Sequence, residues 1–192
     1  MNKLDKKGFS LIEILITIAI IVIVSVSTTV FMSTLLNAKE QKAVNALRSN
    51  IENLRTRSMS VSGNYYIEIA NKEGTIYITS YKDGEELESE KLASGVNLSL
   101  FYTKEDSTTG TNLEVGDNIF LEFNKTTGAI SGFYLNASPV ISTTSINGES
   151  VKELSFNYER DISSVSYVNF NLKARKTKSL TLYLKTGMLQ GG

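Results

Sequence analysis

The stretch KKGFSLIEILITIAIIVIVSVSTTVFMSTLL, at residues 6–36, decides the fold of this chain. Glu13 is the only charged residue that follows Lys7 within it. The run Ile14–Leu36 carries no formal charge. As a helix that rises about 1.5 Å per residue, this run would extend about 35 Å, against a hydrocarbon core of roughly 30 Å. The sequence therefore predicts a helix that is able to span a membrane.

The carboxylate of Glu13 is the unusual feature of this apolar segment. An unpaired carboxylate in hydrocarbon costs roughly 2.5–3.5 kcal/mol on insertion scales. The Ile, Leu, Val and Phe side chains contribute about −0.3 to −0.6 kcal/mol each, so together they outweigh this cost and insertion should succeed. A charged residue kept in such a segment is a functional candidate that needs a partner. We expect the partner of Glu13 to lie in another chain.

The residues before the apolar run set its orientation. Lys3, Lys6 and Lys7 against Asp5 alone predict a cytoplasmic N-terminus, so everything after Leu36 should lie outside the cytoplasm. A secretory signal peptide is one alternative, but the run is too long and no clear small-residue cleavage site follows it. A plain signal-anchor is another alternative, and it leaves the acidic residue unexplained.

Residues 6–16, KKGFSLIEILI, resemble the N-terminal signal of the type IV pilin and pseudopilin family. The resemblance implies that residues 1–8 are a leader, which a prepilin peptidase removes between Gly8 and Phe9. It also implies N-methylation of Phe9. Glu13 then becomes the fifth residue of the mature chain, and its carboxylate is expected to pair with the Phe9 ammonium of a neighbouring subunit.

The resemblance also implies a function. The chain is expected to be a minor pilin or pseudopilin of a type IV pilus or a type II secretion-like filament, with no enzymatic activity. The implied partners are other pilin or pseudopilin subunits, the prepilin peptidase, an inner-membrane assembly platform and the lipid bilayer. Many pilins have a helix-bending proline at the position of Val30, whereas Pro139 is the only proline here, which disfavours the alternative of a major pilin.

The composition of the chain limits the chemistry that the residues after the apolar run can perform. The 192 residues contain twenty basic and twenty acidic side chains, so the chain as a whole has no bias toward nucleic acid. Zero Cys excludes a disulfide, and zero His and Cys remove the usual zinc ligands and the usual general base. We therefore expect no cofactor, no metal and no catalytic residue. An extracytoplasmic enzyme on a signal-anchor is a third hypothesis, without residues that favour it.

The helix is expected to continue beyond its membrane-spanning part at residues 9–36 into an amphipathic part at residues 37–62. Apolar residues there recur at spacings of three, four and three, which predicts one apolar stripe that covers a sheet. A coiled-coil partner is the alternative use of this stripe. The stripe consists of Val44, Leu47, Ile51 and Leu54. The charged side chains expected in solvent are Lys39, Glu40, Lys42, Arg48, Glu52, Arg55 and Arg57.

Residues 63–192 are expected to form an extracytoplasmic β-rich globular domain, because apolar residues alternate there with a period of two. Turn sequences with Gly separate the strands. The acidic residues 83–90 are expected to form a solvated loop, and residues 107–112 and 136–150 the other loops. The predicted fold is α+β, with a long N-terminal helix packed on antiparallel sheets. The expected strands are Tyr65–Ile69, Thr75–Tyr81, Val96–Tyr102, Asn118–Phe123, Ile130–Leu135, Leu154–Tyr158, Tyr167–Lys173 and Leu180–Leu184.

This layout is similar to that of H-type minor pseudopilins and FimT-like minor pilins, some of which bind DNA. Basic residues near the last predicted hairpin offer a weak phosphate or DNA contact through Arg175, Lys176 and Lys178. An exposed hairpin turn explains the same charges without a ligand. A DNA-binding or adhesive subunit at the tip of a filament is therefore the alternative function.

Overall fold

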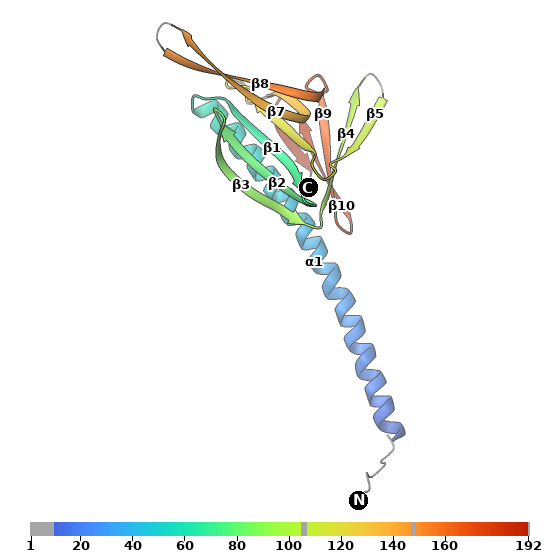
Figure 1. Ribbon diagram of the computed structural model, residues 1–192. Helices are drawn as coiled ribbons and strands as arrows, with labels where there is room; N and C mark the ends of the chain where they lie inside the picture. The colour runs from blue at the N-terminus through green and yellow to red at the C-terminus, as the bar shows by residue number, and fades with distance from the viewer. Residues whose placement is uncertain (1–9, 105–106, 147–148, 192) are drawn as a thin grey trace, which may run out of the picture.

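The computed structural model describes residues 10–104, 107–146 and 149–191. These residues form one long helix, α1 (Leu11–Ser60), followed by eleven strands. In Figure 1, α1 extends far below the sheets, and its second half runs along them. The strands are β1 (Tyr65–Lys72), β2 (Thr75–Lys82), β3 (Glu85–Ser94), β4 (Asn97–Lys104), β5 (Ser107–Asn112), β6 (Asn118–Phe123), β7 (Ile130–Ile146), β8 (Glu149–Asp161), β9 (Tyr167–Lys173), β10 (Thr177–Tyr183) and β11 (Met188–Gly191).

The strands form two sheets. The six-stranded sheet has the order β3-β2-β1-β6-β7-β8, and the five-stranded sheet has the order β11-β10-β9-β4-β5. Every strand pair in both sheets is antiparallel. The expected α+β fold, with one long helix on antiparallel sheets, is confirmed.

The second half of α1 packs against both sheets and contributes to the hydrophobic core. It contacts β1, β2 and β3 of the first sheet and β9, β10 and β11 of the second. Val44, Leu47, Ile51 and Leu54 are all buried in one cluster with apolar side chains from both sheets. The apolar stripe therefore packs against the sheets of its own chain, as expected from its spacing. The helix ends at Ser60, two residues before the expected end at residue 62.

All eight expected strands occur, and two of them, β6 and β9, have the expected bounds. Two regions that were expected to be loops are strands instead. The acidic residues 85–94 form β3, an edge strand that pairs with β2, and residues 107–112 form β5, an edge strand that pairs with β4. Charged and polar residues are tolerated on such edges, since one side of the strand faces water and charge discourages pairing with other chains.

The prediction of a loop at residues 136–150 is also wrong. β7 extends to Ile146 and β8 begins at Glu149, and the two strands pair as a ribbon that projects from the sheet in Figure 1. Asn136 has a φ of 48° and directly follows Leu135, the last residue of β7 that pairs with β6. Phe156 of this ribbon packs against Tyr66 and Phe120, so part of the outer face of the six-stranded sheet is also buried.

Two of the Gly-containing turns expected between the strands are hairpin turns. Glu73 and Gly74 join β1 to β2 with φ of 54° and 76°, and Asp83 and Gly84 join β2 to β3 with φ of 50° and 85°. Two consecutive residues with positive φ are typical of the turn that matches the twist of a two-residue hairpin, and glycine adopts this conformation without strain.

Candidate functional site

The first turn of α1 is built around Glu13. Ser10 is the N-cap residue, and its side-chain oxygen accepts a hydrogen bond from the Glu13 backbone N–H at 3.3 Å. In return, Oε2 of Glu13 accepts a hydrogen bond from the Ser10 backbone N–H at 2.8 Å. This reciprocal pair is a capping box, which satisfies two backbone donors that a helix start otherwise leaves unpaired.

The capping box gives Glu13 a role within its own chain that the sequence analysis missed. The signal was available, because Ser followed three residues later by Glu at the start of an apolar run is typical of this cap. The capping box leaves acceptor capacity on the carboxylate unused, since an ionised carboxylate offers about four acceptor positions on two oxygens. Gly8 and Phe9, the expected cleavage and methylation residues, lie outside the described residues.

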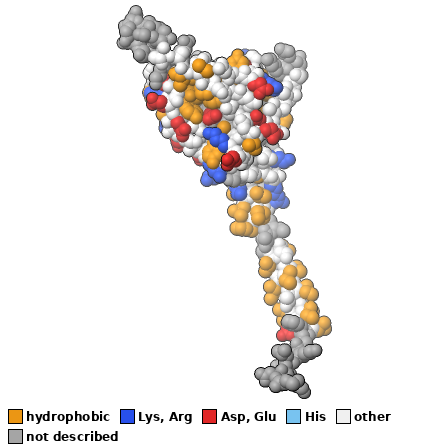
Figure 2. Space-filling model, viewed as in Figure 1, with side chains coloured by type: hydrophobic (Ala, Val, Ile, Leu, Met, Phe, Trp, Pro, Cys, Tyr) orange, Lys and Arg blue, Asp and Glu red, His pale blue; other side chains and the backbone are white. Residues whose placement is uncertain are grey.

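The first half of α1 carries apolar side chains in every direction. Leu11 is 83% exposed and Phe31 is 64% exposed. By length and composition, α1 is the one helix among the described residues that could cross a membrane, and nothing within its most apolar window is buried. Figure 2 shows this segment as an orange stem below the globular part. A helix that is apolar all round is suited to a bilayer or to the interior of an assembly.

The expectation that Glu40 is solvated is wrong. Glu40 is only 1% exposed, and its Oε1 accepts hydrogen bonds from the backbone N–H groups of Ala174, Arg175 and Lys176 at 2.5–3.1 Å. These three residues form the turn between β9 and β10. The carboxylate of Glu40 therefore fixes this turn to the helix, near the point where α1 enters the globular part.

The protonation state of Glu40 follows from these contacts. Burial raises the pKa of the Glu40 carboxyl, but the hydrogen bonds from Arg175, Lys176 and Ala174 and the nearby charge of Lys178 lower it by more. The pKa of Glu40 therefore lies below its usual value, and the group is ionised at neutral pH. Among the described residues, no donor reaches its second oxygen, Oε2.

A sequence signal for the burial of Glu40 was present. Glu40 lies four residues before Val44 and seven before Leu47, so it falls on the apolar stripe rather than on the opposite face of the helix. A charged residue on a buried stripe is expected only where it is paired or hydrogen-bonded. The spacing alone therefore separates Glu40 from its neighbour Lys39, which is exposed.

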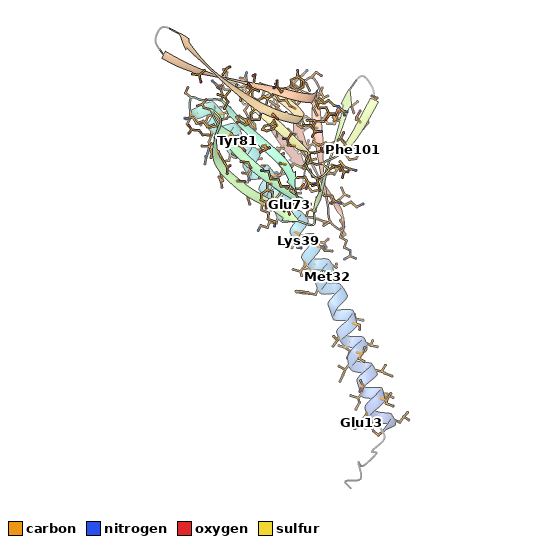
Figure 3. The ribbon with its side chains drawn as sticks, viewed as in Figure 1. Glu13, Met32, Lys39, Glu73, Tyr81 and Phe101 are labelled. Carbon is orange, nitrogen blue, oxygen red and sulfur yellow. The ribbon has the colours of Figure 1, made fainter. Side chains whose placement is uncertain are left out.

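Of the three basic residues proposed from the sequence, two lie in the β9–β10 turn and the third lies near the start of β10. Arg175 and Lys176 are exposed, and Lys178 is half-buried. Figure 2 shows Lys and Arg side chains gathered at the lower rim of the globular part, directly above the apolar stem. In Figure 3, Lys39 lies at this rim, with Met32 below it on the stem. In Figure 1, the turn at the start of β10 lies at the lower end of the sheets, from which the apolar helix emerges.

The described residues show no alternative centre for metal chemistry. Among them, no group of three or more His, Cys, Asp or Glu side chains is placed to hold a metal ion. The two candidate features described above are the capped apolar helix and the basic rim above it.

Comparison with known families identifies the first of these features. The prokaryotic N-terminal methylation motif matches residues 3–29. This motif is the class III signal of type IV pilins, and it supports a subunit of the pilin or pseudopilin kind. The comparisons with curated proteins and with solved structures gave no match. The match covers the first part of α1 and the residues before it, so it does not describe the globular part.

Proposed function

We propose that the chain is a structural subunit, a minor pilin or pseudopilin, of a type IV pilus or a type II secretion-like filament. It is inserted in the cytoplasmic membrane with its N-terminus in the cytoplasm and is later transferred into the filament. The observation that carries the proposal is the exposed, uniformly apolar first half of α1 with one carboxylate at its start, within the matched motif. Such a helix fits both the bilayer and the core of a filament, so the subunit can move from the first environment to the second.

Processing would create the partner of Glu13. Cleavage between Gly8 and Phe9 leaves an ammonium on Phe9, which stays cationic after methylation. Two opposite charges in a medium of low effective dielectric attract strongly, and each removes the cost of leaving the other unpaired. Because the hydrogen bond from Ser10 occupies only Oε2, the Glu13 carboxylate has acceptor capacity for an ammonium of the neighbouring subunit.

The shape of α1 supports a minor rather than a major subunit. The helix is continuous from Leu11 to Ser60, and it contains no proline, since Pro139 is the only one in the chain. It therefore lacks the bend that a missing N–H and a ring clash would introduce. The alternative of a major pilin, whose helix often carries such a bend, is less well supported.

Substitution of Glu13 tests the proposal. Glu13→Ala should leave membrane insertion intact, because removing the charge lowers the insertion cost. Incorporation into filaments should fall about tenfold or more, because the Phe9 ammonium of the neighbour then lacks its counter-charge. The measurement is the amount of subunit in sheared, purified filaments relative to the amount in membranes. The intact mass of the assembled subunit should correspond to a chain that begins at methylated Phe9.

Ser10→Ala is the matched control, since it removes half of the capping box and keeps the Glu13 carboxylate. If only the charge pair matters for assembly, this variant should be incorporated at close to the normal level. Normal incorporation of Glu13→Ala would contradict the charge-pair proposal. A filament subunit that still begins at Met1 would contradict the proposed processing.

A DNA-binding role at a filament tip is the second candidate, and it depends on Arg175, Lys176 and Lys178. Their side chains remain available, but Glu40 already occupies the three backbone N–H groups of this turn. The turn also lies beside the helix exit rather than at the far end of the globular part, as Figure 1 shows at the start of β10. Its position therefore favours a partner at the membrane side of the domain.

A further inference from the structure

The height of the basic rim above the apolar helix can be estimated from the sequence. The uncharged run ends at Leu36, and Lys39 follows three residues later, about 4.5 Å further along the helix. The headgroup layer on each side of a bilayer is about 5–7 Å thick. When Ile14–Leu36 spans the hydrocarbon, Lys39 therefore lies at the level of the outer headgroups.

Five basic residues from two elements gather at this height, and we call them the basic collar. Two come from α1 and three from the β9–β10 turn and the start of β10. Glu40 holds the two groups together, because its carboxylate on α1 binds the backbone of the turn. Four of the five side chains are exposed, and the fifth is half-buried. The basic collar consists of Lys39, Lys42, Arg175, Lys176 and Lys178.

Acidic residues also lie near the collar and offset part of its charge. The carboxylate of Glu40 lies inside the molecule, where it accepts hydrogen bonds from backbone N–H groups and also interacts with the charge of Lys178, so it offsets one of the five basic charges. Figure 2 shows Asp or Glu side chains on the lower rim beside the Lys and Arg side chains. Because the whole chain is neutral, with twenty charges of each sign, the excess of basic residues here is a local asymmetry.

We propose that the basic collar binds anionic lipid headgroups of the outer leaflet and so seats the globular domain on the bilayer before the subunit is extracted. The proposal depends on the membrane anchoring proposed above. Juxtamembrane basic clusters are attracted by anionic lipids, and the attraction falls off within a Debye length of the surface. The helix brings the collar to that distance, whereas nucleic acid would have to enter the narrow space between the domain and the membrane.

The absence of Cys from the chain allows a site-specific test on the full-length protein. Thr177→Cys places one fluorophore on an exposed position between Lys176 and Lys178. Thr126→Cys is the matched control on the exposed β6–β7 turn. Arg55 donates a hydrogen bond to Gly128 of that turn, which places it about 22 Å further along α1 than Glu40.

The labelled proteins are reconstituted into vesicles that contain a headgroup-attached quencher. One set is made of phosphatidylcholine, and in the other phosphatidylglycerol replaces part of it. Quenching at residue 177 should be about threefold or more greater with phosphatidylglycerol, while quenching at residue 126 should not change. The increase should disappear in high salt and in a variant with Gln at all five collar positions. Added inorganic phosphate should not abolish the increase, because a surface presents many headgroups at once.

Equal quenching at residue 177 in the two kinds of vesicle would overturn the proposal. Release of the collar by an added DNA duplex, with no effect of phosphatidylglycerol, would overturn it in favour of nucleic acid. Release of the whole protein from the vesicles by an alkaline carbonate wash would instead contradict the proposed membrane anchoring. It would also contradict the seating of the domain, which depends on that anchoring. Insertion without a lipid effect would contradict the seating alone.

Discussion

The two halves of α1 belong to one continuous helix, but their surroundings are opposite. In the first half, Ile12 and Ile23 are each 66% exposed. In the second half, Val44, Leu47 and Ile51 are fully buried against the two sheets. Figure 1 shows the change along the helix, from a bare stem to a segment that lies along the strands.

The difference follows from how apolar residues are distributed around the helix. In the first half they point in all directions, so a single sheet could not cover them and the segment needs an apolar medium on every side. In the second half they follow one stripe, which one packed face buries completely. The fold of the globular part therefore depends on the second half, while the first half is available for the bilayer or for other subunits.

The largest expected effect on the free energy of unfolding comes from an Ile to Ala substitution in the second half of α1, compared with the same substitution in the first half. Ile51→Ala should lower the free energy of unfolding of the globular domain by roughly 2–5 kcal/mol, because Ile51 is fully buried and its loss leaves a cavity. Ile20→Ala should change it by less than about 0.5 kcal/mol, since Ile20 is 55% exposed. Urea unfolding of the full-length chain in detergent, followed by the near-ultraviolet signal of tyrosine, measures both. Similar losses for the two variants would contradict the division of α1 into two halves.

A smaller effect is expected where the two halves meet, at Glu40. Glu40→Ala should lower the free energy of unfolding by about 1.5–3 kcal/mol, because three backbone N–H groups lose an ionised acceptor. Glu40→Gln, which keeps the size and one acceptor oxygen, should lose less. Urea unfolding at neutral pH compares the three proteins. A loss no greater in Glu40→Ala than in Lys39→Ala, an exposed neighbour, would contradict the role of this contact.

The same contact predicts a pH dependence. The pKa of Glu40 is lower in the folded chain than its ordinary value, so the contact stabilises the fold above that ordinary value, near 4.5. The stabilisation is lost as the pH falls through the lowered folded value, because the protonated carboxyl is a weaker acceptor. The difference in unfolding free energy between the native chain and Glu40→Gln should therefore shrink as the pH falls below 4.5.

The features predicted correctly from the sequence are those set by nearby residues. The stripe of Val44, Leu47 and Ile51 is visible because a helix brings residues three and four apart to one face. The turn at Glu73 and Gly74 is visible because its backbone conformation favours glycine. Both patterns are complete within a few residues, so no knowledge of the tertiary fold is required.

The features that were missed depend on distant partners. Glu40 binds a turn that follows it by 134 to 136 residues, so the sequence around it does not reveal the partner. β3 contains four carboxylates in residues 85–94, a composition that is depleted in strands, and its pairing with β2 overrides this propensity. The basic collar likewise combines α1 with residues near the C-terminus, and only the fold places them together.

The smallest expected effect concerns the first turn of α1, where stability is local. Ser10→Ala removes the side-chain acceptor for the Glu13 backbone N–H and should cost this turn about 1 kcal/mol. Hydrogen exchange of the Glu13 amide in detergent should become about fivefold faster, while exchange of the Leu47 amide should not change, because the bare half has no sheet to couple it to the core. Ser10→Asn retains an N-cap acceptor and should restore slow exchange. Faster exchange at Leu47 in Ser10→Ala would show that the two halves of the helix open together. The first half of α1 would then be part of the cooperative unit that the second half forms with the sheets.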